Sequence, residues 1–569
     1  MFPVRLGADR HRSNHQHRQS LPTTAMLLSR IVHFLTQAST LRRCPQPQPC
    51  EGLTLKVGSS IPDIQILSLT SHEVHNYQSP YTQGQKLDFC DVTVTLTHAN
   101  ESDLVQLSVW LPFPSAWNGR FLATGGGGLA TGYIGYAQPA AVIQGYAAAA
   151  TEGGLTLNGT IDPQTGQWGL RADGRLNTAL LTNYAHRSVH DLAVLGKALT
   201  TAFYGTAPRF SYWHGCSTGG RQGFVAAALY PADYDGILAA SPGIHLPELF
   251  AWLLWPPALM LNASSASSPP PPPPPPQCVF SAFQQSIIEA CDALDGAADG
   301  LISGSGNCPF DASGLVSTTI PCAETNTSVT ITEQHATLVQ AILNGPVDPA
   351  TGDTLWYGLP PGASFRGTAD TTTTNGTHPT TATTRINPFL PAVSWLRNFL
   401  LKNPTYNIST LTIPGFVDAV HASREQFGDL LSKEQLGLEG FQQAGGKLLA
   451  WHGLADEIVP PAGTVKYREM VGEAFSEQNV DVEDFFRLFL APGAGHCGGN
   501  FGVGYGPVPV DALGALVRWV EDAVEPETLF AEVAGVGRRV TRELCLWPGV
   551  LRWDGEGGLD LAGSFGCEE

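Results

Sequence analysis

The segment with the clearest chemical potential places a serine between two glycines. It reads Tyr212-Trp-His-Gly-Cys-Ser-Thr-Gly-Gly220 and contains the pattern Gly215-X-Ser217-X-Gly219. A strand-like stretch, Phe210–Trp213, precedes it and a helix-like stretch, Arg221–Leu229, follows. Glycines on both sides let the backbone turn sharply, so that a serine hydroxyl stands clear and the next N–H points at the same spot. We interpret Ser217 as a candidate nucleophile.

A serine nucleophile needs a base and a carboxylate that orients the base. The chain offers Asp456 just after a strand-like stretch that begins at Lys447, and His496 in a glycine turn after a second such stretch that begins at Phe485. Ser, Asp, His is the chain order of the α/β-hydrolases. Taken singly, Asp456 also fits an ordinary helix cap and His496 a turn histidine. The ordered trio favours a catalytic triad.

Two residues of this trio each have a cysteine as a direct neighbour in the chain. Cys216 immediately precedes Ser217, and Cys497 immediately follows His496. If Ser217 and His496 lie within hydrogen-bonding reach, their neighbours lie within bridging distance, so we predict a Cys216–Cys497 disulfide. The disulfide would close a loop of about 280 residues, for which the chain-entropy model gives a stabilisation of about 4 kcal/mol or more.

The elements around these residues alternate between strand and helix, which is typical of an α/β fold. Val92–Leu96 and Val105–Trp110 alternate as half-buried strands do. Ser188–Leu199 carries apolar residues at helical spacing, and Asp511 is placed to cap a helix near the end of the chain.

The middle of the chain has a different texture. Pro269–Pro276 is an unbroken proline run, expected to form an extended polyproline II segment, and the threonine-rich Thr368–Thr384 is expected to form an exposed loop. The simplest architecture is an α/β-hydrolase fold built from both ends of the chain, with a large inserted lid domain. The expected division is a leader or mobile arm at 1–49, a catalytic domain at 50–240 and 446–569, and a disulfide-braced lid at 241–445.

Taken together, the motifs resemble the tannase/feruloyl esterase family of fungi and bacteria, whose members are secreted carboxylic ester hydrolases. The resemblance covers roughly residues 50 to 567. The matching segments are Trp117-Asn-Gly-Arg-Phe121 with the glycine loop after it, Gly215-Cys-Ser-Thr-Gly-Gly-Arg-Gln-Gly223, Trp451-His-Gly-Leu-Ala-Asp456 and Pro492-Gly-Ala-Gly-His-Cys-Gly498.

This resemblance implies a role for each site residue. Ser217 would be the nucleophile, His496 the base and Asp456 its orienter, with the N–H groups of Thr218 and Gly127 forming the oxyanion hole. The implied reaction is two-step hydrolysis of an ester with an aromatic acyl group, through an acyl-enzyme. We favour a feruloyl esterase that acts on small aromatic esters or on feruloylated polysaccharide such as arabinoxylan, and the alternative is a tannase that removes galloyl groups.

A second constellation is Cys291-Asp-Ala-Leu-Asp-Gly-Ala-Ala-Asp-Gly-Leu-Ile302. Its carboxylates and backbone carbonyls are ligands of the kind that calcium prefers, although the spacing is not that of an EF-hand and an acidic surface turn also fits. The resemblance implies a structural Ca²⁺ in the lid. The implied ligands are the carboxylates of Asp292, Asp295 and Asp299 and the backbone oxygens of Ala297 and Leu301.

The other cysteines suit disulfides between neighbours along the chain. Cys44 is left over from this scheme, which leaves the pairing at the N-terminus open. The expected pairs are Cys50 with Cys90, Cys278 with Cys291, Cys308 with Cys322, and Cys545 with Cys567.

Composition points to an exported globular protein. The net charge of −19 repels phosphate backbones, which disfavours nucleic acid as a partner, and no stretch is apolar for long enough to span a membrane. Residues 1–25 are basic and polar, and the apolar stretch that follows Met26 is weak as a signal peptide. We expect a secreted glycoprotein because six N-glycosylation sequons accompany 11 cysteines. The family resemblance implies a monomer or homodimer. The sequons begin at Asn100, Asn158, Asn262, Asn326, Asn375 and Asn407.

Two other classes of function fit parts of the pattern. One is an inactive secreted protein that binds phenolic compounds or glycans, which the intact Ser217, Asp456 and His496 disfavour. The other is a serine peptidase or lipase, which the paired cysteines disfavour. His214 and His452 are interpreted as structural, His214 packed in its strand and His452 supporting the loop of Asp456.

Overall fold

The computed structural model describes nine ranges of the chain: residues 46–55, 63–82, 84–263, 273–304, 308–374, 383–435, 437–499, 506–533 and 539–568. All of them belong to one compact unit, Gln46–Glu569. Cys44, Asn375, most of the expected leader and the first half of the proline run lie outside these ranges. Within the ranges, every helix is too short or too polar to cross a membrane.

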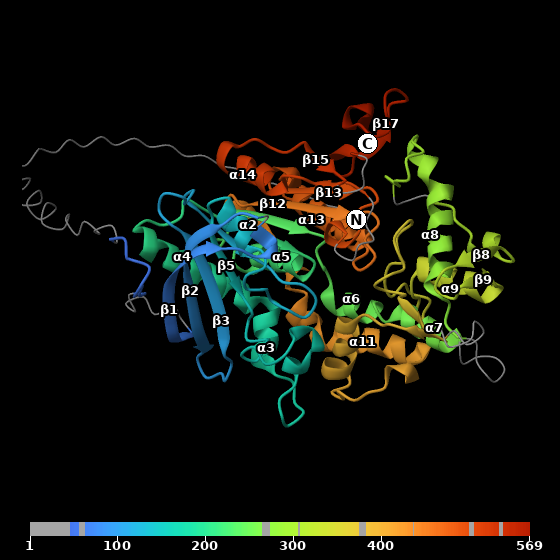
Figure 1. Ribbon diagram of the computed structural model, residues 1–569, viewed down its shortest axis with the longest axis horizontal. Coiled ribbons are helices and arrows are strands. Elements are labelled where there is room, and N and C mark those ends of the chain that lie inside the picture. The colour runs from blue at the N-terminus through green and yellow to red at the C-terminus, as the bar shows by residue number, and fades with distance from the viewer. Residues whose placement is uncertain are drawn as a thin grey trace, which may run out of the picture. The chain divides into compact units, whose positions relative to one another are not determined.

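A nine-stranded mixed sheet forms the centre of the unit, in the order β1-β2-β3-β5-β4-β6-β7-β12-β13 (Figure 1). Neighbours from β1 to β5 pair antiparallel, and neighbours from β5 to β13 pair parallel. In the parallel part, the carboxyl ends of β6, β7, β12 and β13 therefore meet at one edge. The strands are β1 Ile64–Tyr77, β2 Leu87–His98, β3 Val105–Pro112, β4 Arg120–Thr124, β5 Ala147–Thr151, β6 Phe210–Cys216, β7 Gly236–Ala240, β12 Lys447–Gly453 and β13 Phe486–Ala491.

Helices cover both faces of this sheet because successive strand residues point to opposite sides. Leu448 and Ala450 of β12 pack in one core, whereas Leu449 and Trp451 pack in the other. The first core is shared with α4 Ser188–Tyr204, α5 Thr218–Leu229, α12 Glu439–Gln443 and α13 Pro461–Ser476, and the second with α2 Gln138–Ile143 and α14 Ala512–Asp522. These elements confirm the predicted α/β texture, including the cap of α14, where the Asp511 carboxylate accepts a hydrogen bond from the Gly514 N–H.

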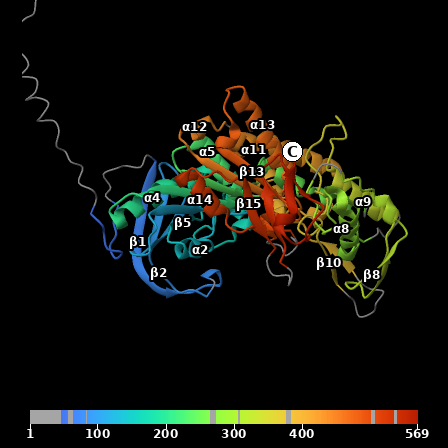
Figure 2. The same cartoon turned by 90° about the horizontal axis from the view of Figure 1, so that it is seen from above.

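We call residues 241–445 the insert, and helices are the main regular elements of its described part. In its described part the insert adds no strand to the nine-stranded sheet. Figures 1 and 2 place α8, α9 and β8 on the side of the molecule away from β1. The helices are α6 Leu246–Trp252, α7 Trp255–Ala263, α8 Gln277–Cys291, α9 Glu333–Asn344, α10 Leu390–Ser394 and α11 Ile413–Leu431, and one hairpin is β8 Thr319–Cys322 with β9 Thr327–Thr330.

The threonine-rich segment does not form the predicted loop over its described length. Thr371–Thr374 (β10) and Thr383–Ile386 (β11) pair antiparallel as a hairpin. The physical reason is that threonine is β-branched and favours extended backbone, a preference that outweighs its polarity here.

The short elements not yet named complete the fold. The last strands form two small sheets, and Leu546, the residue after β16, forms an isolated bridge to Phe489 of β13. These strands are β14 Val508–Pro509, β15 Thr528–Glu532, β16 Thr541–Cys545, β17 Val550–Trp553 and β18 Phe565–Glu568, and the one further α-helix in the described ranges is α3 Thr178–Thr182.

Candidate active site

Ser217 stands in the turn between β6 and α5 with strained backbone angles, φ 62° and ψ −125°. A side chain at either flanking glycine would collide with the backbone. A Cβ on Gly215 would lie 2.3 Å from the Gly219 carbonyl oxygen, and a Cβ on Gly219 would lie 2.8 Å from that of Gly126. The strand, strained serine and helix have the form of a nucleophile elbow.

Asp456 lies in the loop after β12 and is fully buried. Its Oδ1 accepts hydrogen bonds from the N–H groups of Ile458 (2.9 Å) and Val459 (2.7 Å). Its Oδ2 lies 2.9 Å from Nδ1 of His496, which follows β13. The carboxylate is thus fixed by its own loop and bound to the imidazole, as an orienting residue must be.

His452 supports this loop from β12, as the sequence predicted. Its Nε2 lies 3.1 Å from Asp456 Oδ2 and 2.9 Å from the Val459 carbonyl oxygen, and its Nδ1 lies 2.9 Å from the Thr464 hydroxyl. His452 is fully buried, so it contacts the carboxylate away from water.

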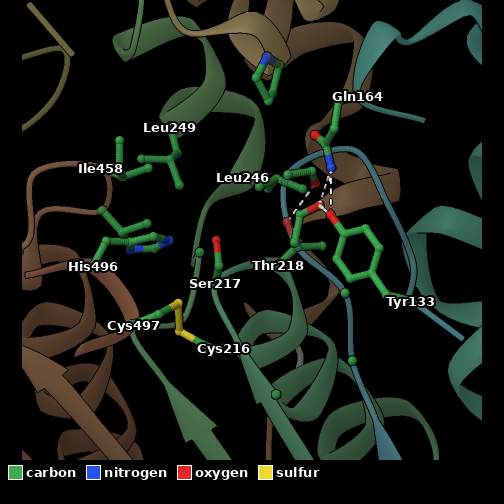
Figure 3. Close-up of a pocket in the computed structure, with 18 of the residues that line it drawn as sticks. Tyr133, Gln164, Cys216, Ser217, Thr218, Leu246, Leu249, Ile458, His496 and Cys497 are labelled. Atoms are coloured by element: carbon green, nitrogen blue, oxygen red, sulfur yellow. Dashed lines mark hydrogen bonds between the residues drawn. A yellow bond between two sulfur atoms is a disulfide. The ribbon is translucent and has the colours of Figure 1, made fainter. Parts of the chain in front are cut away.

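The predicted disulfide between Cys216 and Cys497 is confirmed, with Cα atoms 5.9 Å apart. It joins the residue before Ser217 to the residue after His496. Ser217 and His496 line the same pocket, and Figure 3 shows the imidazole and the hydroxyl facing each other across it, with the disulfide beneath. The fold therefore brings together all three residues of the predicted triad.

Backbone donors stand beside the serine hydroxyl. Thr218 is the first residue of α5, so its N–H lies at the positive end of the helix dipole. In the loop after β4, the Gly126 N–H donates to Gln222 Oε1 (3.1 Å), whereas the Gly127 N–H has no partner among the described residues. The Gly127 carbonyl oxygen accepts hydrogen bonds from the Tyr133 hydroxyl and from Gln164 Nε2, which fix the peptide.

The pocket over Ser217 has a volume of about 730 Å³. Its apolar wall comes from the insert and from the Asp456 loop, and in Figure 3 Leu246, Leu249 and Ile458 stand above the serine. Tyr133 and Gln164 form the opposite wall, where Gln164 Nε2 donates to the Tyr133 hydroxyl (2.7 Å). The space is large enough for one drug-sized ligand with an apolar ring.

His214 differs from its predicted place. It was expected to be packed in its strand, but its side chain is exposed to open space and the residue lines the pocket. The imidazole borders the open pocket but lies deep in the protein, and the resulting desolvation lowers its pKa.

Electrostatics around His496 favour a basic imidazole. Burial alone would lower the pKa of His496, but the charge and hydrogen bond of Asp456 raise it above its usual value. Burial would conversely raise the pKa of Asp456, but the charge of His496 and the hydrogen bonds from both histidines hold it well below its usual range. The pair therefore favours an ionised carboxylate beside a protonatable base.

Glu457 is a site residue that the sequence did not reveal. It is fully buried, and its Oε2 accepts a hydrogen bond from the His496 backbone N–H (3.0 Å), while its Oε1 is buried without a hydrogen-bond partner. Burial and the neighbouring charge of Asp456 raise the pKa of Glu457 to about 7. Its position directly after Asp456 was the one available signal.

The predicted calcium ligands lie in one loop after α8. Asp292 Oδ1 accepts a hydrogen bond from the Gly300 N–H, Asp295 Oδ1 from the Ala297 N–H, and Asp299 Oδ1 from the Leu301 N–H. The other oxygen of Asp299 pairs with Arg542. Burial and the charge of Asp299 raise the pKa of both Asp292 and Asp295.

Two predicted disulfides near this loop are wrong. The structure pairs Cys278 with Cys322 and Cys291 with Cys308, instead of Cys278 with Cys291 and Cys308 with Cys322. Cys278 and Cys291 stand at opposite ends of α8, so about 20 Å of helix separates them, far beyond bridging distance. The pairs Cys50–Cys90 and Cys545–Cys567 are confirmed.

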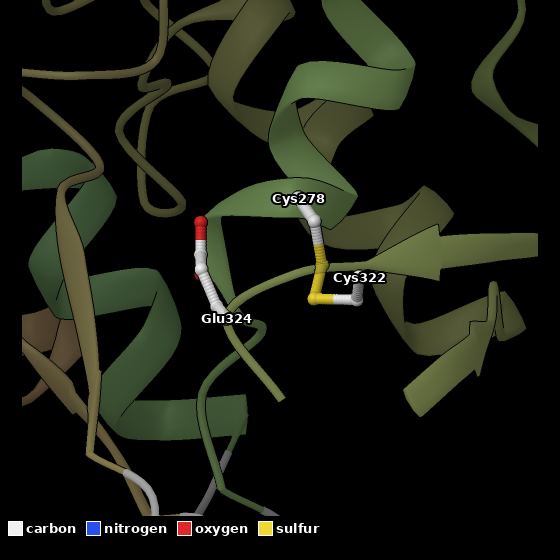
Figure 4. Close-up of side chains that lie close together, drawn as sticks. All are labelled: Cys278, Cys322 and Glu324. Carbon is white, nitrogen blue, oxygen red and sulfur yellow. A yellow bond between two sulfur atoms is a disulfide. The ribbon is translucent and has the colours of Figure 1, made fainter. Parts of the chain in front are cut away.

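One cluster of metal-ligand residue types within the described ranges consists of Cys278, Cys322 and Glu324. Figure 4 shows that the two sulfurs are bonded to each other. The disulfide leaves no thiolate for a metal, and Glu324 Oε2 accepts a hydrogen bond from the Gln277 N–H (2.9 Å). This cluster is therefore a disulfide with a helix-capping carboxylate.

Comparison with known proteins identifies the family. The family described as tannase and feruloyl esterase matches residues 90–568. The chain is 40% identical over 493 residues to a probable feruloyl esterase of Arthroderma benhamiae, covering 86% of this chain and 87% of the relative. It is 30% identical over 552 residues to feruloyl esterase C of Talaromyces stipitatus, covering 92% and 96%. The chain belongs to the tannase and feruloyl esterase family, as the sequence motifs predicted, and members of this family are carboxylic ester hydrolases.

Solved structures agree with this assignment. Tannin acyl hydrolase from Aspergillus niger superposes with a TM-score of 0.77 at 26% identity, covering 90% of this chain and 93% of that one. Feruloyl esterase B from Aspergillus oryzae superposes with a TM-score of 0.71 at 25% identity, covering 91% and 99%.

The charge of Glu457 generates a testable pH dependence. As the predicted base, His496 could accept a proton only when neutral, so we expect activity to fall as pH drops through the His496 pKa. An ionised Glu457 favours the imidazolium, and Glu457→Gln removes that charge while keeping an oxygen for the His496 N–H. We expect the acid limb of the kcat/KM profile to move to lower pH by roughly half a unit or more.

The measurement is a pH–rate profile of the variant and the wild type on one soluble ester. Glu473→Gln, which changes an exposed glutamate of α13, serves as the control and should leave the profile in place. Superimposable acid limbs for Glu457→Gln and wild type would show that Glu457 exerts no charge effect on the base.

Proposed function

We propose that this protein hydrolyses carboxylic esters of phenolic acids, with feruloyl esters of plant cell-wall polysaccharide as the first candidate substrates. The observation that carries the proposal is that Ser217 and His496 line the same pocket. Ser217 stands at a strained elbow, and His496 is bound to Asp456. The pocket's apolar wall suits an aromatic acyl group.

The proposed mechanism has two steps. His496 takes the proton of Ser217 as the hydroxyl oxygen attacks the ester carbonyl, and the N–H groups of Thr218 and Gly127 hold the oxyanion. The C–O bond to the alcohol then breaks, and the alcohol leaves with the proton from His496. Water, deprotonated by His496, attacks the acyl-enzyme and releases the acid, and Asp456 stabilises the imidazolium in both steps.

The insert serves in this proposal as a lid that shapes the acyl pocket of an α/β-hydrolase. Helix α6 and the segment around Pro391 supply its apolar side chains to the pocket over Ser217. Feruloyl groups are the first candidates because two relatives that cover most of the chain carry the name feruloyl esterase. Galloyl groups are the second, because a tannin acyl hydrolase superposes with a TM-score of 0.77.

We also propose that the protein is secreted and glycosylated. Five disulfides in the described residues favour an oxidising compartment. Glycan attachment requires an accessible asparagine, and four of the five sequon asparagines that the structure describes are exposed. The exposed asparagines are Asn100, Asn158, Asn326 and Asn407.

A structural Ca²⁺ at the loop after α8 completes the proposal. The donors fit the ion in kind, because three carboxylates crowd into eight residues and their burial and mutual repulsion raise the pKa of two of them. Asp292, Asp295 and Asp299, with the carbonyl oxygens of Ala297 and Leu301, would hold the ion. Bound there, it would offset the negative charge and brace the insert against β16, from which Arg542 reaches Asp299.

The nucleophile is tested with two small esters. Ser217→Ala should lower kcat for methyl ferulate or methyl gallate by at least roughly a thousandfold, because no other group replaces the attacking oxygen. Release of the acid by purified wild type and variant is followed by chromatography, and the faster ester names the acyl class. Ser476→Ala, at an exposed serine of α13, is the control. Activity that survives in Ser217→Ala contradicts the nucleophile, and a folded wild type that cleaves neither ester contradicts the proposed substrates.

The calcium proposal predicts a loss of thermal stability on chelation. Treatment with a chelator should lower the melting temperature by a few degrees, and Ca²⁺ should restore it, because the acidic loop would again repel itself without the ion. Asp295→Asn should remove this response, whereas Asp311→Asn, at an exposed aspartate of the insert, should keep it. A melting temperature that is the same with chelator and with Ca²⁺ would contradict the site.

A further inference from the structure

Three tyrosines form a row at the rim of the pocket, and we call Tyr81, Tyr136 and Tyr133 the tyrosine row. The rings of Tyr81 and Tyr136 are 4.7 Å apart between centroids, and those of Tyr136 and Tyr133 are 6.1 Å apart. Tyr133 and Tyr136 line the pocket, whereas Tyr81 lies beyond it. The row therefore leads from the pocket onto the outer surface.

The row is unusually exposed for side chains of this size. The exposed fractions are 46% for Tyr81, 49% for Tyr136 and 39% for Tyr133, and the neighbouring Ile134 is also 39% exposed. A contiguous exposed apolar patch next to a pocket marks an interaction site more often than isolated apolar residues do. This exposure makes the row a candidate interaction surface.

Two separate segments hold the row in place. Tyr81 stands on the short helical turn Pro80–Thr82 between β1 and β2, and Tyr133 and Tyr136 stand in the loop between β4 and α2. The Tyr133 hydroxyl donates to the Gly127 carbonyl oxygen (3.0 Å) and accepts from Gln164 Nε2. The inner end of the row is therefore tied to Gly127, the residue whose N–H is the proposed oxyanion donor.

We propose that the tyrosine row is a subsite for the sugar rings of a glycan ester, an inference that rests on the proposed function. A pocket of about 730 Å³ has room for one aromatic acyl group and its nearest sugar, so the remaining glycan must pass over the rim. Sugar rings present C–H faces that pack on aromatic rings, and they present hydroxyls at their edges.

A carboxylate beside the row can accept hydrogen bonds from those hydroxyls. Asp162 is exposed and lines the pocket on the same side as Tyr133, whereas Gln164 between them is engaged with Gly127 and Tyr133 and holds the wall in place. The exposed carboxylate next to exposed rings suits a ring rich in hydroxyl groups, and the buried apolar wall around Leu249 and Phe250 suits the acyl group. In this proposal the wall with the tyrosine row contacts the sugar, and the apolar wall contacts the acyl group.

The test compares two feruloyl esters that differ only in the alcohol. One is methyl ferulate, and the other is a feruloylated arabinoxylan oligosaccharide. Tyr81→Ala should raise KM for the oligosaccharide ester roughly five- to tenfold with kcat nearly unchanged, and should leave both constants for methyl ferulate within about twofold. Tyr81→Phe keeps the ring and should behave like wild type. Phe530→Ala, at a ring on β15 with 41% exposure outside the pocket lining, is the control.

The outcomes separate this proposal from the proposed function. Equal losses on both esters, or no change on either, would overturn the subsite. If wild type cleaves galloyl esters instead, the same comparison uses galloyl glucose and methyl gallate. If wild type cleaves none of these esters, calorimetric titration with unesterified arabinoxylo-oligosaccharide decides. Binding that is lost in Tyr81→Ala would support the subsite, and absence of binding to wild type would overturn it.

Discussion

The backbone at Ser217 is held in a conformation that residues with a side chain rarely adopt, and the site depends on the packing that keeps it there. Such strain costs about 1–3 kcal/mol and persists only where its surroundings impose it. The Gly219 N–H donates to the Gly126 carbonyl oxygen (3.0 Å), and Trp213 Nε1 donates to the Gly219 carbonyl oxygen (2.9 Å). The disulfide between Cys216 and Cys497 then ties the strained turn to the loop of the base. The proposed nucleophile, oxyanion loop and base are thus held together at one edge of the parallel sheet.

Buried charge is the second constraint on this edge. Asp456 is shielded from water, so its charge is stabilised by donors from its own loop and by two imidazoles. Glu457 lies beside it without comparable compensation, because one of its oxygens has no hydrogen-bond partner, and its pKa rises to about 7. His496, the proposed base, therefore lies between one carboxylate that stays ionised and one that titrates near neutral pH. The geometry of the loops thus influences the protonation of His496 as well as its position.

Local sequence patterns sufficed to predict the alternation of strands and helices and the positions of Ser217, Asp456 and His496 after strands. The Cys216–Cys497 disulfide followed from these positions, because the carboxyl ends of neighbouring parallel strands meet at one edge of the sheet. The predicted disulfides of the insert were wrong for the opposite reason. Cys278 and Cys291 lie at opposite ends of helix α8, and their true partners are brought near only by the tertiary fold. The hairpin of Thr371–Thr374 depended on a β-propensity that the sequence interpretation gave too little weight. Glu457 and the tyrosine row have no motif, because burial and exposure arise from tertiary packing.

The central claim is that Ser217 attacks its substrate with His496 as the base. A p-nitrophenyl phosphonate ester tests this directly, because a serine oxygen that attacks phosphorus displaces p-nitrophenolate and stays labelled. Mass spectrometry of the digested protein should find the label on the peptide that contains Ser217, and His496→Ala should slow p-nitrophenolate release by roughly a hundredfold or more. A label on any other residue, or release at the wild-type rate in His496→Ala, would contradict the account.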